Sequence, residues 1–251
     1  MRREVVTLRS PSTGVEGRMV AYGHWGRPLL AFPSQEGRCT DWEERGMVDA
    51  VAGPLEAGRA KLYCVDSFDS GTWFADDQPL EERARRHGWY EGWILDQVAP
   101  WIERDCGGTR EILTAGCSFG AFHAVNFTLK HAHRFPVAIG MSGVYDLAGV
   151  GWGERGEAFY FNNPTDYVAN LGGEHLEWLR RQATVVLVCG QGQWEDTTGA
   201  LASTRRFGEL LAAKGLRGAV DLWGHDVPHD WPSWGAQLAH HLPQLLEQGH
   251  P

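Results

Sequence analysis

The sequence predicts an α/β fold with a mainly parallel sheet of eight strands and helices on both of its faces. Short apolar runs bounded by Gly, Pro and Ser recur along the chain, and longer segments with helical periodicity separate them. These gaps can hold the crossovers that parallel strands require. The 251 residues, 43% of them hydrophobic, can bury a sizeable core. We therefore expect residues 1–251 to form a single domain.

The expected strands are short and apolar. Pro11-Ser12-Thr13-Gly14 is turn chemistry and leaves no room for a helix between the first two, so we expect an antiparallel hairpin there. The eight strands lie near Glu4–Arg9, Arg18–His24, Pro28–Pro33, Lys61–Asp66, Arg110–Cys117, Pro136–Met141, Ala183–Cys189 and Gly218–Trp223.

From the third strand onward every gap is long enough for a helix. Crossovers of this kind bring the loops that follow the strands to one edge of the sheet, where we expect the functional site. Residues 144–182 exceed a simple crossover and are expected to form a small cap over that site. The expected helices cover about Asp41–Ala52, Leu80–Asp105, Phe119–His131, Thr197–Lys214 and Trp231–Gln248.

Composition argues for a small-molecule partner. The formal charge is −9 and the chain has no dense run of Lys and Arg, which disfavours nucleic acid or an anionic membrane as the main partner. No stretch approaches the roughly 20 apolar residues of a membrane span, and the N-terminus lacks a signal-peptide core. We expect a cytoplasmic protein, and assembly into a homo-oligomer stays open.

One pentapeptide, Gly116-Cys117-Ser118-Phe119-Gly120, has the G-x-S-x-G pattern of a nucleophile elbow. The motif alone is weak, but here it follows an expected strand and precedes an expected helix. Glycines before and after Ser118 would let strand and helix approach closely while the serine is held in a strained turn. We predict that Ser118 is a nucleophile, and that Cys117 points into the sheet.

An activated serine needs a histidine base and a carboxylate that orients it, in the chain order Ser, acid, His. The loop after the seventh strand offers Glu195 and Asp196. We choose Asp196 for its shorter, stiffer side chain, although it could equally be a helix N-cap. The loop after the last strand offers His225 and His229, and we choose His229 because it directly precedes the final helix.

Two further groups of residues are expected at the same edge. The oxyanion hole should use the backbone N–H of Phe119 and a second one from the loop after the third strand, at Ser34 or Gln35. Tryptophans on expected loops could form aromatic walls for a substrate. These are Trp73, Trp152, Trp194 and Trp231.

No metal site or disulfide framework is indicated. The five cysteines are an odd number without C-x-x-C spacing. His131-Ala132-His133 lies at a helix end, where the dipole favours such side chains, and has no evident third ligand. His123, inside the expected elbow helix, is more typical of a packed, hydrogen-bonded histidine.

Taken in order, residues 116–124, Tyr160-Phe161-Asn162-Asn163-Pro164 and His229-Asp230-Trp231 resemble the putative-esterase family of α/β-hydrolases. Its relatives include esterase D, feruloyl and acetylxylan esterases, and mycolyltransferases. The resemblance implies an α/β-hydrolase fold and a serine carboxylesterase without a cofactor, acting on a small-molecule ester. It places Ser118, Asp196 and His229 at the positions of nucleophile, acid and base. Phe32-Pro33 replaces the histidine-glycine pair often found at the oxyanion loop.

Two other functions are compatible with the same residues. An acyltransferase would use an alcohol in place of water with the same triad. A non-catalytic binding module could also use this fold, because fold does not imply function.

Overall fold

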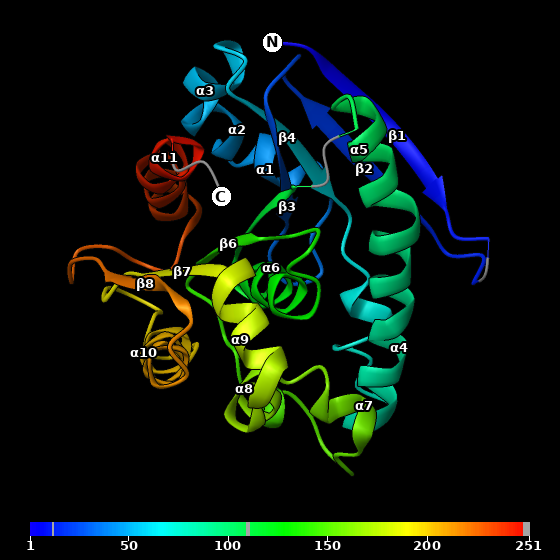
Figure 1. Cartoon of the computed structure of the whole chain (residues 1–251), viewed down its shortest axis with the longest axis vertical. Helices are drawn as coiled ribbons and strands as arrows, with labels where there is room; N and C mark the ends of the chain where they lie inside the picture. Colours follow the sequence, from blue (N-terminus) through cyan, green and yellow to red (C-terminus); the bar gives the residue numbers. More distant parts are fainter. Residues whose placement is uncertain (12, 109–110, 248–251) are drawn as a thin grey trace.

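One mixed sheet forms the centre of the molecule (Figure 1). In the computed structural model, which describes residues 1–11, 13–108 and 111–247, eight strands run in the order β1-β2-β4-β3-β5-β6-β7-β8. β2 is antiparallel to β1 and β4, whereas the pairs from β4-β3 to β7-β8 are parallel. The strands are β1 (Arg3–Arg9), β2 (Glu16–Tyr22), β3 (Arg27–Phe32), β4 (Ala60–Val65), β5 (Leu113–Cys117), β6 (Val137–Met141), β7 (Thr184–Cys189) and β8 (Arg217–Leu222).

These strands confirm the predicted fold class and the N-terminal hairpin. Ser12 of the expected turn, Arg110 at the expected start of the fifth strand and Gln248 at the expected end of the last helix lie outside the described residues.

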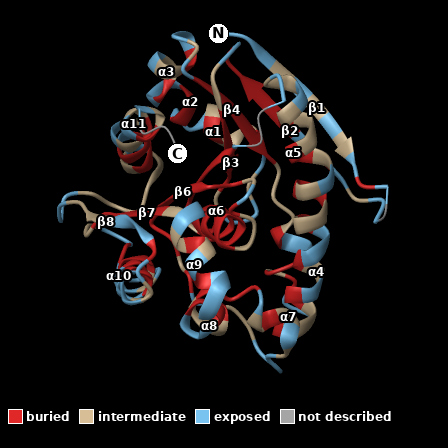
Figure 2. Ribbon diagram, in the orientation of Figure 1, coloured by how far each residue is buried: buried red, intermediate tan, exposed pale blue. Residues whose placement is uncertain are grey.

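Helices cover both faces of the sheet. One face carries α1 (Asp41–Glu44), α2 (Met47–Ala50), α3 (Ala52–Glu56) and α11 (Trp231–Glu247), whose apolar side chains share a core with the strands. The other face carries α4 (Leu80–Trp93), η2 (Ile94–Val98), α5 (Ala99–Asp105), α6 (Phe119–Lys130) and α10 (Ala200–Ala213). Figure 2 shows α6 and the central strands as buried. The central strands are accordingly mostly apolar, because both of their faces are covered.

Three expected helices differ in detail. Residues 41–52 form separate short helices because Gly46, at φ 82°, turns the chain. Residues 80–105 are helical throughout, but η2 is a π-helical segment just before Pro100, which has no N–H to donate. α10 starts at Ala200 and not at Thr197, because Gly199 is left-handed.

The segment expected to be a cap contains η3 (Leu147–Gly149), α7 (Glu157–Tyr160), α8 (Pro164–Asn170) and α9 (Gly173–Gln182). Glu81 of α4 holds the start of α7. Its carboxylate accepts the backbone N–H groups of Gly156, Ala158 and Phe159 at 2.8 to 3.0 Å. Burial acts to raise the pKa of Glu81, but these hydrogen bonds outweigh it and the pKa is lowered.

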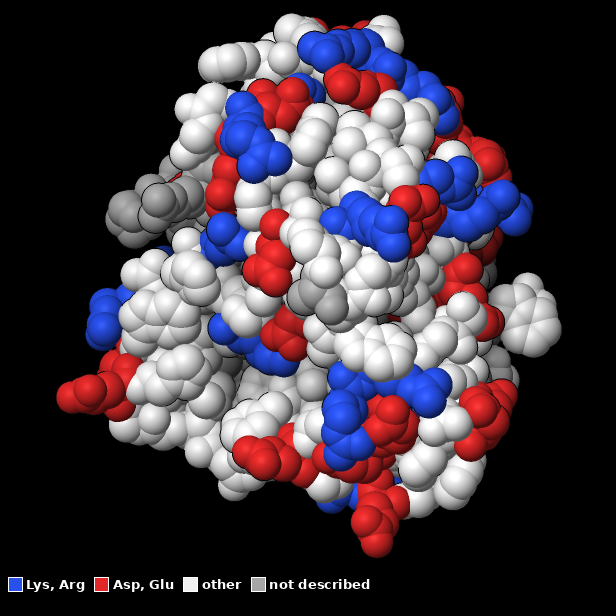
Figure 3. Space-filling model, turned by 90° about the vertical axis from the view of Figure 1, so that its right-hand side faces the viewer, with Lys and Arg blue, Asp and Glu red and all other residues white. Residues whose placement is uncertain are grey.

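Charges of both signs mix on the surface. On the face shown in Figure 3, Lys and Arg lie beside Asp and Glu and do not form one continuous basic patch. Arg85 and Arg86, for example, both pair with Glu82. Within residues 1–11, 13–108 and 111–247, no helix has the length and apolar character required to cross a bilayer.

Candidate active site

Ser118 lies in the tight turn between β5 and α6. Its φ of 54° and ψ of −123° are strained for a residue with a side chain. A Cβ on Gly116 would lie 2.0 Å from the carbonyl oxygen of Gly120, and one on Gly120 would lie 2.1 Å from that of Pro33. Only glycine allows strand, helix and the loop after β3 to approach this closely. The predicted elbow geometry is therefore present.

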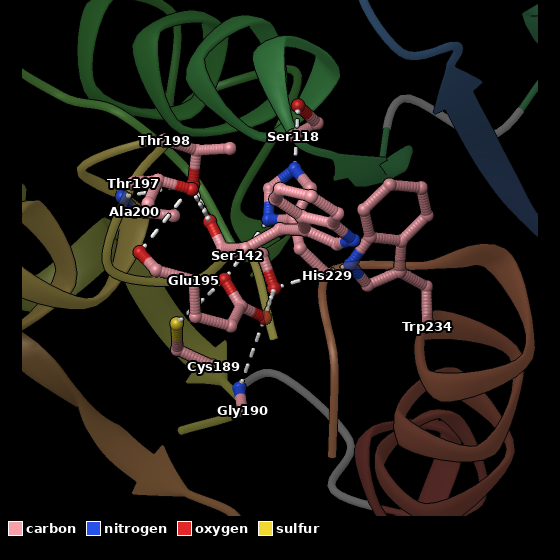
Figure 4. A network of polar contacts seen from close by, with 11 residues as sticks. Ser118, Ser142, Cys189, Gly190, Glu195, Thr197, Thr198, Ala200, His229 and Trp234 are labelled. Carbon is pink, nitrogen blue, oxygen red and sulfur yellow. Dashed lines mark hydrogen bonds and ion pairs between the residues drawn. The ribbon is translucent and has the colours of Figure 1, made fainter. Parts of the chain in front are cut away.

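His229 lies beside this serine, in the loop between β8 and α11 (Figure 4). Its Nε2 is 3.1 Å from Ser118 Oγ. The backbone N–H of His229 donates to the carbonyl oxygen of Gln193 at 2.9 Å, and the ring packs edge-on against Trp234. These contacts hold the imidazole toward the serine. His225, the alternative in the sequence, is exposed four residues earlier.

The carboxylate that contacts His229 belongs to Glu195. Its Oε2 is 2.9 Å from Nδ1 of His229, on the opposite side of the ring from Ser118. Glu195 is 0% exposed, whereas Asp196 is exposed. The expectation of Asp196 is thus corrected, because Trp194 at φ 75° turns the chain so that Glu195 points inward. Asp196 is not the N-cap of α10 either, since Gly199 occupies that position.

Glu195 is held by a polar network that the sequence reasoning missed. Ser142, which follows β6, donates its hydroxyl to Glu195 Oε1 at 2.6 Å. The indole N–H of Trp234 donates in turn to Ser142 Oγ at 3.1 Å. The backbone N–H of Gly190 also donates to Oε1, at 3.3 Å. These donors replace the hydrogen bonds to water that the buried carboxylate has lost. A serine directly after a strand was the one sequence signal for Ser142.

Nearby cysteine thiols are buried and protonated. Burial, followed by the carboxylate of Glu195, raises the pKa of Cys189 to about 12. Burial also raises the pKa of Cys117, which is 0% exposed and packs in the core between the sheet and α11. Since the thiolate is the nucleophilic form of cysteine, Cys117 is unsuited to replace Ser118.

The loop after β3 borders the elbow. The carbonyl oxygens of Phe32 and Pro33 lie against Gly120, the second residue of α6. Ser34 is half-buried and Gln35 is exposed, and both follow directly. The start of this loop therefore lies against the start of α6. The assignment of the Phe119 N–H and of a second N–H from Ser34 or Gln35 as donors stays a prediction.

The four tryptophans expected to line the site occupy different environments. Trp152 and Trp194 are each 56% exposed. Trp231 is half-buried and packs edge-on against Trp234. Trp73 is 0% exposed and packs against Phe122 and Phe159, so its expected role as an exposed aromatic wall is corrected. The loop that carries it folds inward and adds to an apolar cluster beneath the elbow helix.

One group of side chains among the described residues could hold a metal ion. It consists of Asp221, His240 and His241, whose ligand atoms lie within 4.8 Å of one another. Asp221 Oδ2 already contacts His241 Nε2 at 3.0 Å and accepts the indole N–H of Trp223 at 2.8 Å. None of these residues belongs to the Ser118 site. His131 of the sequence pair contacts Glu91 at 2.6 Å.

Known proteins resemble this chain in sequence pattern and fold. A family model described as "Putative esterase" matches residues 33–245. No curated protein matches. A solved ferulic acid esterase superimposes with a TM-score of 0.72 at 18% identity, covering 98% of this chain and 97% of that one. S-formylglutathione hydrolase from Staphylococcus aureus gives 0.73 at 11% identity, with 98% and 99% covered. MPT51 from Mycobacterium tuberculosis gives 0.71 at 14% identity, with 98% of each chain covered.

Proposed function

Because this chain belongs to the esterase family, we propose that it hydrolyses carboxylic esters through Ser118, His229 and Glu195, with an acyl-enzyme intermediate. The observation that supports the proposal is a pair of consecutive contacts. Ser118 Oγ contacts His229 Nε2, and His229 Nδ1 contacts Glu195. This is the arrangement that an activated serine requires.

The first half-reaction acylates Ser118. Its Oγ attacks the ester carbonyl while His229 Nε2 takes the hydroxyl proton, and the resulting imidazolium is stabilised by the buried carboxylate of Glu195. The N–H of Phe119 and one from Ser34 or Gln35 stabilise the oxyanion. His229 then returns the proton to the departing alcohol.

The second half-reaction releases the acyl group. Water takes the place of the alcohol, gives a proton to His229 and attacks the acyl carbon. When this second tetrahedral intermediate collapses, the bond to Ser118 Oγ breaks, His229 returns the proton to Oγ, and the acid is released. The chemistry needs only side chains and backbone N–H groups, all supplied by this chain.

Hydrolysis of p-nitrophenyl acetate tests the proposal. The variant Ser118→Ala should lose at least about a thousandfold in kcat/KM, because the nucleophile is gone. Ser70→Ala is a matched control, since Ser70 is exposed and takes no part in these two contacts. Activity of Ser118→Ala equal to that of the wild type would contradict the proposal.

A further inference from the structure

A second buried carboxylate lies beneath the proposed oxyanion hole. Asp69 begins η1 (Asp69–Gly71), in the loop after β4, and is 1% exposed. Its Oδ2 accepts the backbone N–H of Glu36 at 3.0 Å, and its Oδ1 is 2.8 Å from His123 Nε2. Among the ion pairs of the described residues, the partner of Asp69 is His123, not Lys or Arg. Both oxygens of this carboxylate therefore have a hydrogen-bond partner inside the protein.

The contact with Glu36 holds a strained turn. Ser34, Gln35, Glu36 and Gly37 form a turn closed by the Gly37 N–H and the Ser34 carbonyl oxygen at 3.0 Å. Glu36 has φ 53°, an unfavourable value for a residue with a side chain. The hydrogen bond that the Glu36 N–H donates to the buried carboxylate of Asp69 can offset such a cost. The turn contains Ser34 and Gln35, one of which is predicted to supply the second N–H of the oxyanion hole.

The contact with His123 reaches the other half of the oxyanion hole. His123 is 0% exposed and lies on α6, one turn after Phe119, whose ring it meets edge-on at 5.2 Å. Nε2 of the same ring contacts Oδ1 of Asp69 at 2.8 Å. Asp69 thus ties the loop after β3 to the helix that starts with the Phe119 N–H.

Aromatic rings surround this buried pair. His123 stacks on His87 at 5.4 Å and contacts Phe32 and Tyr90. No described residue lies within hydrogen-bonding distance of Nδ1 of His123 or of either ring nitrogen of His87. Polar groups buried this deeply cost free energy, so a core built only for stability would favour apolar side chains here.

We propose that Asp69 and His123 are positioning residues that hold the two N–H donors of the oxyanion hole at a fixed separation. The inference rests on the proposed esterase function, because an oxyanion hole matters only if a tetrahedral intermediate forms. Neither side chain touches the reacting atoms. Their effect is on the transition state, with little effect on binding of the neutral ester.

The variants Asp69→Leu and Asp69→Asn form a matched pair. Leucine is of similar size and accepts no hydrogen bond, whereas asparagine can accept from Glu36 and donate to His123. Asp69→Leu should lower kcat for p-nitrophenyl acetate by roughly 10- to 100-fold, less than the 10²–10³ typical when a donor is removed outright. KM should change less than about threefold, and Asp69→Asn should stay within about fivefold of the wild-type kcat.

Inhibition by a trifluoromethyl ketone distinguishes a displaced oxyanion hole from a general loss of stability, because the Ki is measured on the folded, active protein. Its adduct with Ser118 places an O⁻ in the oxyanion hole, so the inhibition constant Ki should rise by the same factor as kcat/KM, expressed per active site, falls. Active sites are counted with a fluorophosphonate. If Asp69→Leu does not melt cooperatively, His123→Phe replaces it, because it keeps the ring packing and removes the hydrogen bond.

The outcomes separate the two proposals. A folded Asp69→Leu or His123→Phe protein with wild-type kcat and Ki overturns the positioning role while the wild type remains an esterase. A wild-type protein that hydrolyses no ester and is not labelled by the fluorophosphonate overturns the proposed function itself.

Discussion

The carboxylate of Glu195 lies 2.9 Å from the Nδ1 atom of His229, although an aspartate is the next residue in the chain. The direction of the loop, and not the length of the side chain, determines which of the two acids contacts His229. Trp194, at φ 75°, is the residue at which the chain turns, and it leaves Glu195 buried with Trp194 and Asp196 exposed on either side.

The pair of variants Glu195→Gln and Asp196→Asn tests this selection with the same chemical change at adjacent positions. An amide N–H₂ facing His229 Nδ1 favours the tautomer that carries hydrogen on Nε2, which cannot take the proton of Ser118. We expect kcat/KM of Glu195→Gln to fall by about 10³–10⁴ at pH 7, as in other triads.

Asp196→Asn should remain within about twofold of the wild type, because Asp196 faces solvent. Steady-state kinetics with p-nitrophenyl acetate measure both. A larger loss in Asp196→Asn than in Glu195→Gln would refute the assignment of Glu195.

A side chain at an elbow glycine should clash with the neighbouring backbone. In Gly120→Ala the new Cβ would lie 2.1 Å from the Pro33 carbonyl oxygen, so α6 or the loop after β3 must shift. We expect both a loss of most activity and a decrease of about 2 kcal/mol or more in the free energy of unfolding. Urea unfolding and ester hydrolysis report the two effects.

Gly88→Ala is the matched control for this variant. Gly88 lies on the exposed side of α4 with no atom near its would-be Cβ, so alanine should stabilise the protein by about 0.5–1 kcal/mol. If Gly120→Ala proves as stable and active as Gly88→Ala, the close approach at the elbow is refuted.

Variants of exposed and buried tryptophans distinguish contact with the substrate from packing in the core. Trp152→Ala and Trp194→Ala should raise KM for esters with large acyl groups while leaving the melting temperature nearly unchanged, because both rings are 56% exposed. Trp73→Ala should instead cost about 3–5 kcal/mol of stability, since Trp73 is 0% exposed.

Trp89→Ala serves as the control, because Trp89 is 44% exposed on α4. A panel of p-nitrophenyl esters of increasing chain length measures KM. Unchanged KM values across that panel in both Trp152→Ala and Trp194→Ala would remove these residues from the substrate site.

We expect the burial of His87 to make the free energy of unfolding decrease in acid. Burial, and then the neighbouring His123, lowers the pKa of His87 well below 6.5. As the pH falls below about 6.5, the unfolded chain binds a proton at this position while the folded protein does not, so stability is lost. Above that pH the group makes no difference between the two states.

His87→Phe, which keeps the ring stacking on His123 and the tilted contact with Trp73, should remove this loss. The variant should gain on the wild type by up to about 1.4 kcal/mol per pH unit between pH 6.5 and 5. Urea titrations at pH 7, 6 and 5 measure the difference. A constant difference across that range would mean that His87 is protonated in the folded protein.

Much of the architecture follows from local patterns. The order of the apolar strands, the antiparallel pairing of the first two strands and the elbow around Ser118 are each determined by nearby residues, and all three agree with the structure. His229 was favoured for its place just before the last helix, and it is the histidine that lies beside Ser118. Signals of this kind depend on chain order, which a sequence displays directly.

Other features depend on contacts between distant segments. Trp73 is buried because the loop after β4 folds under α6, and Ser142 meets Glu195 across 53 positions of the chain. The choice between Glu195 and Asp196 depends on a backbone angle at Trp194. No local pattern in the sequence specifies these relationships, which explains why the site was predicted in outline and the acid was not.

The covalent intermediate on Ser118 is the central claim, and mass spectrometry of the enzyme quenched during turnover tests it most directly. With p-nitrophenyl acetate in excess, we predict a gain of one acetyl group per chain, which fragmentation assigns to Ser118 within the peptide that also contains Cys117. An acetyl group on Cys117 or on His229, or full turnover by a protein that never carries an acetyl group, would contradict the account.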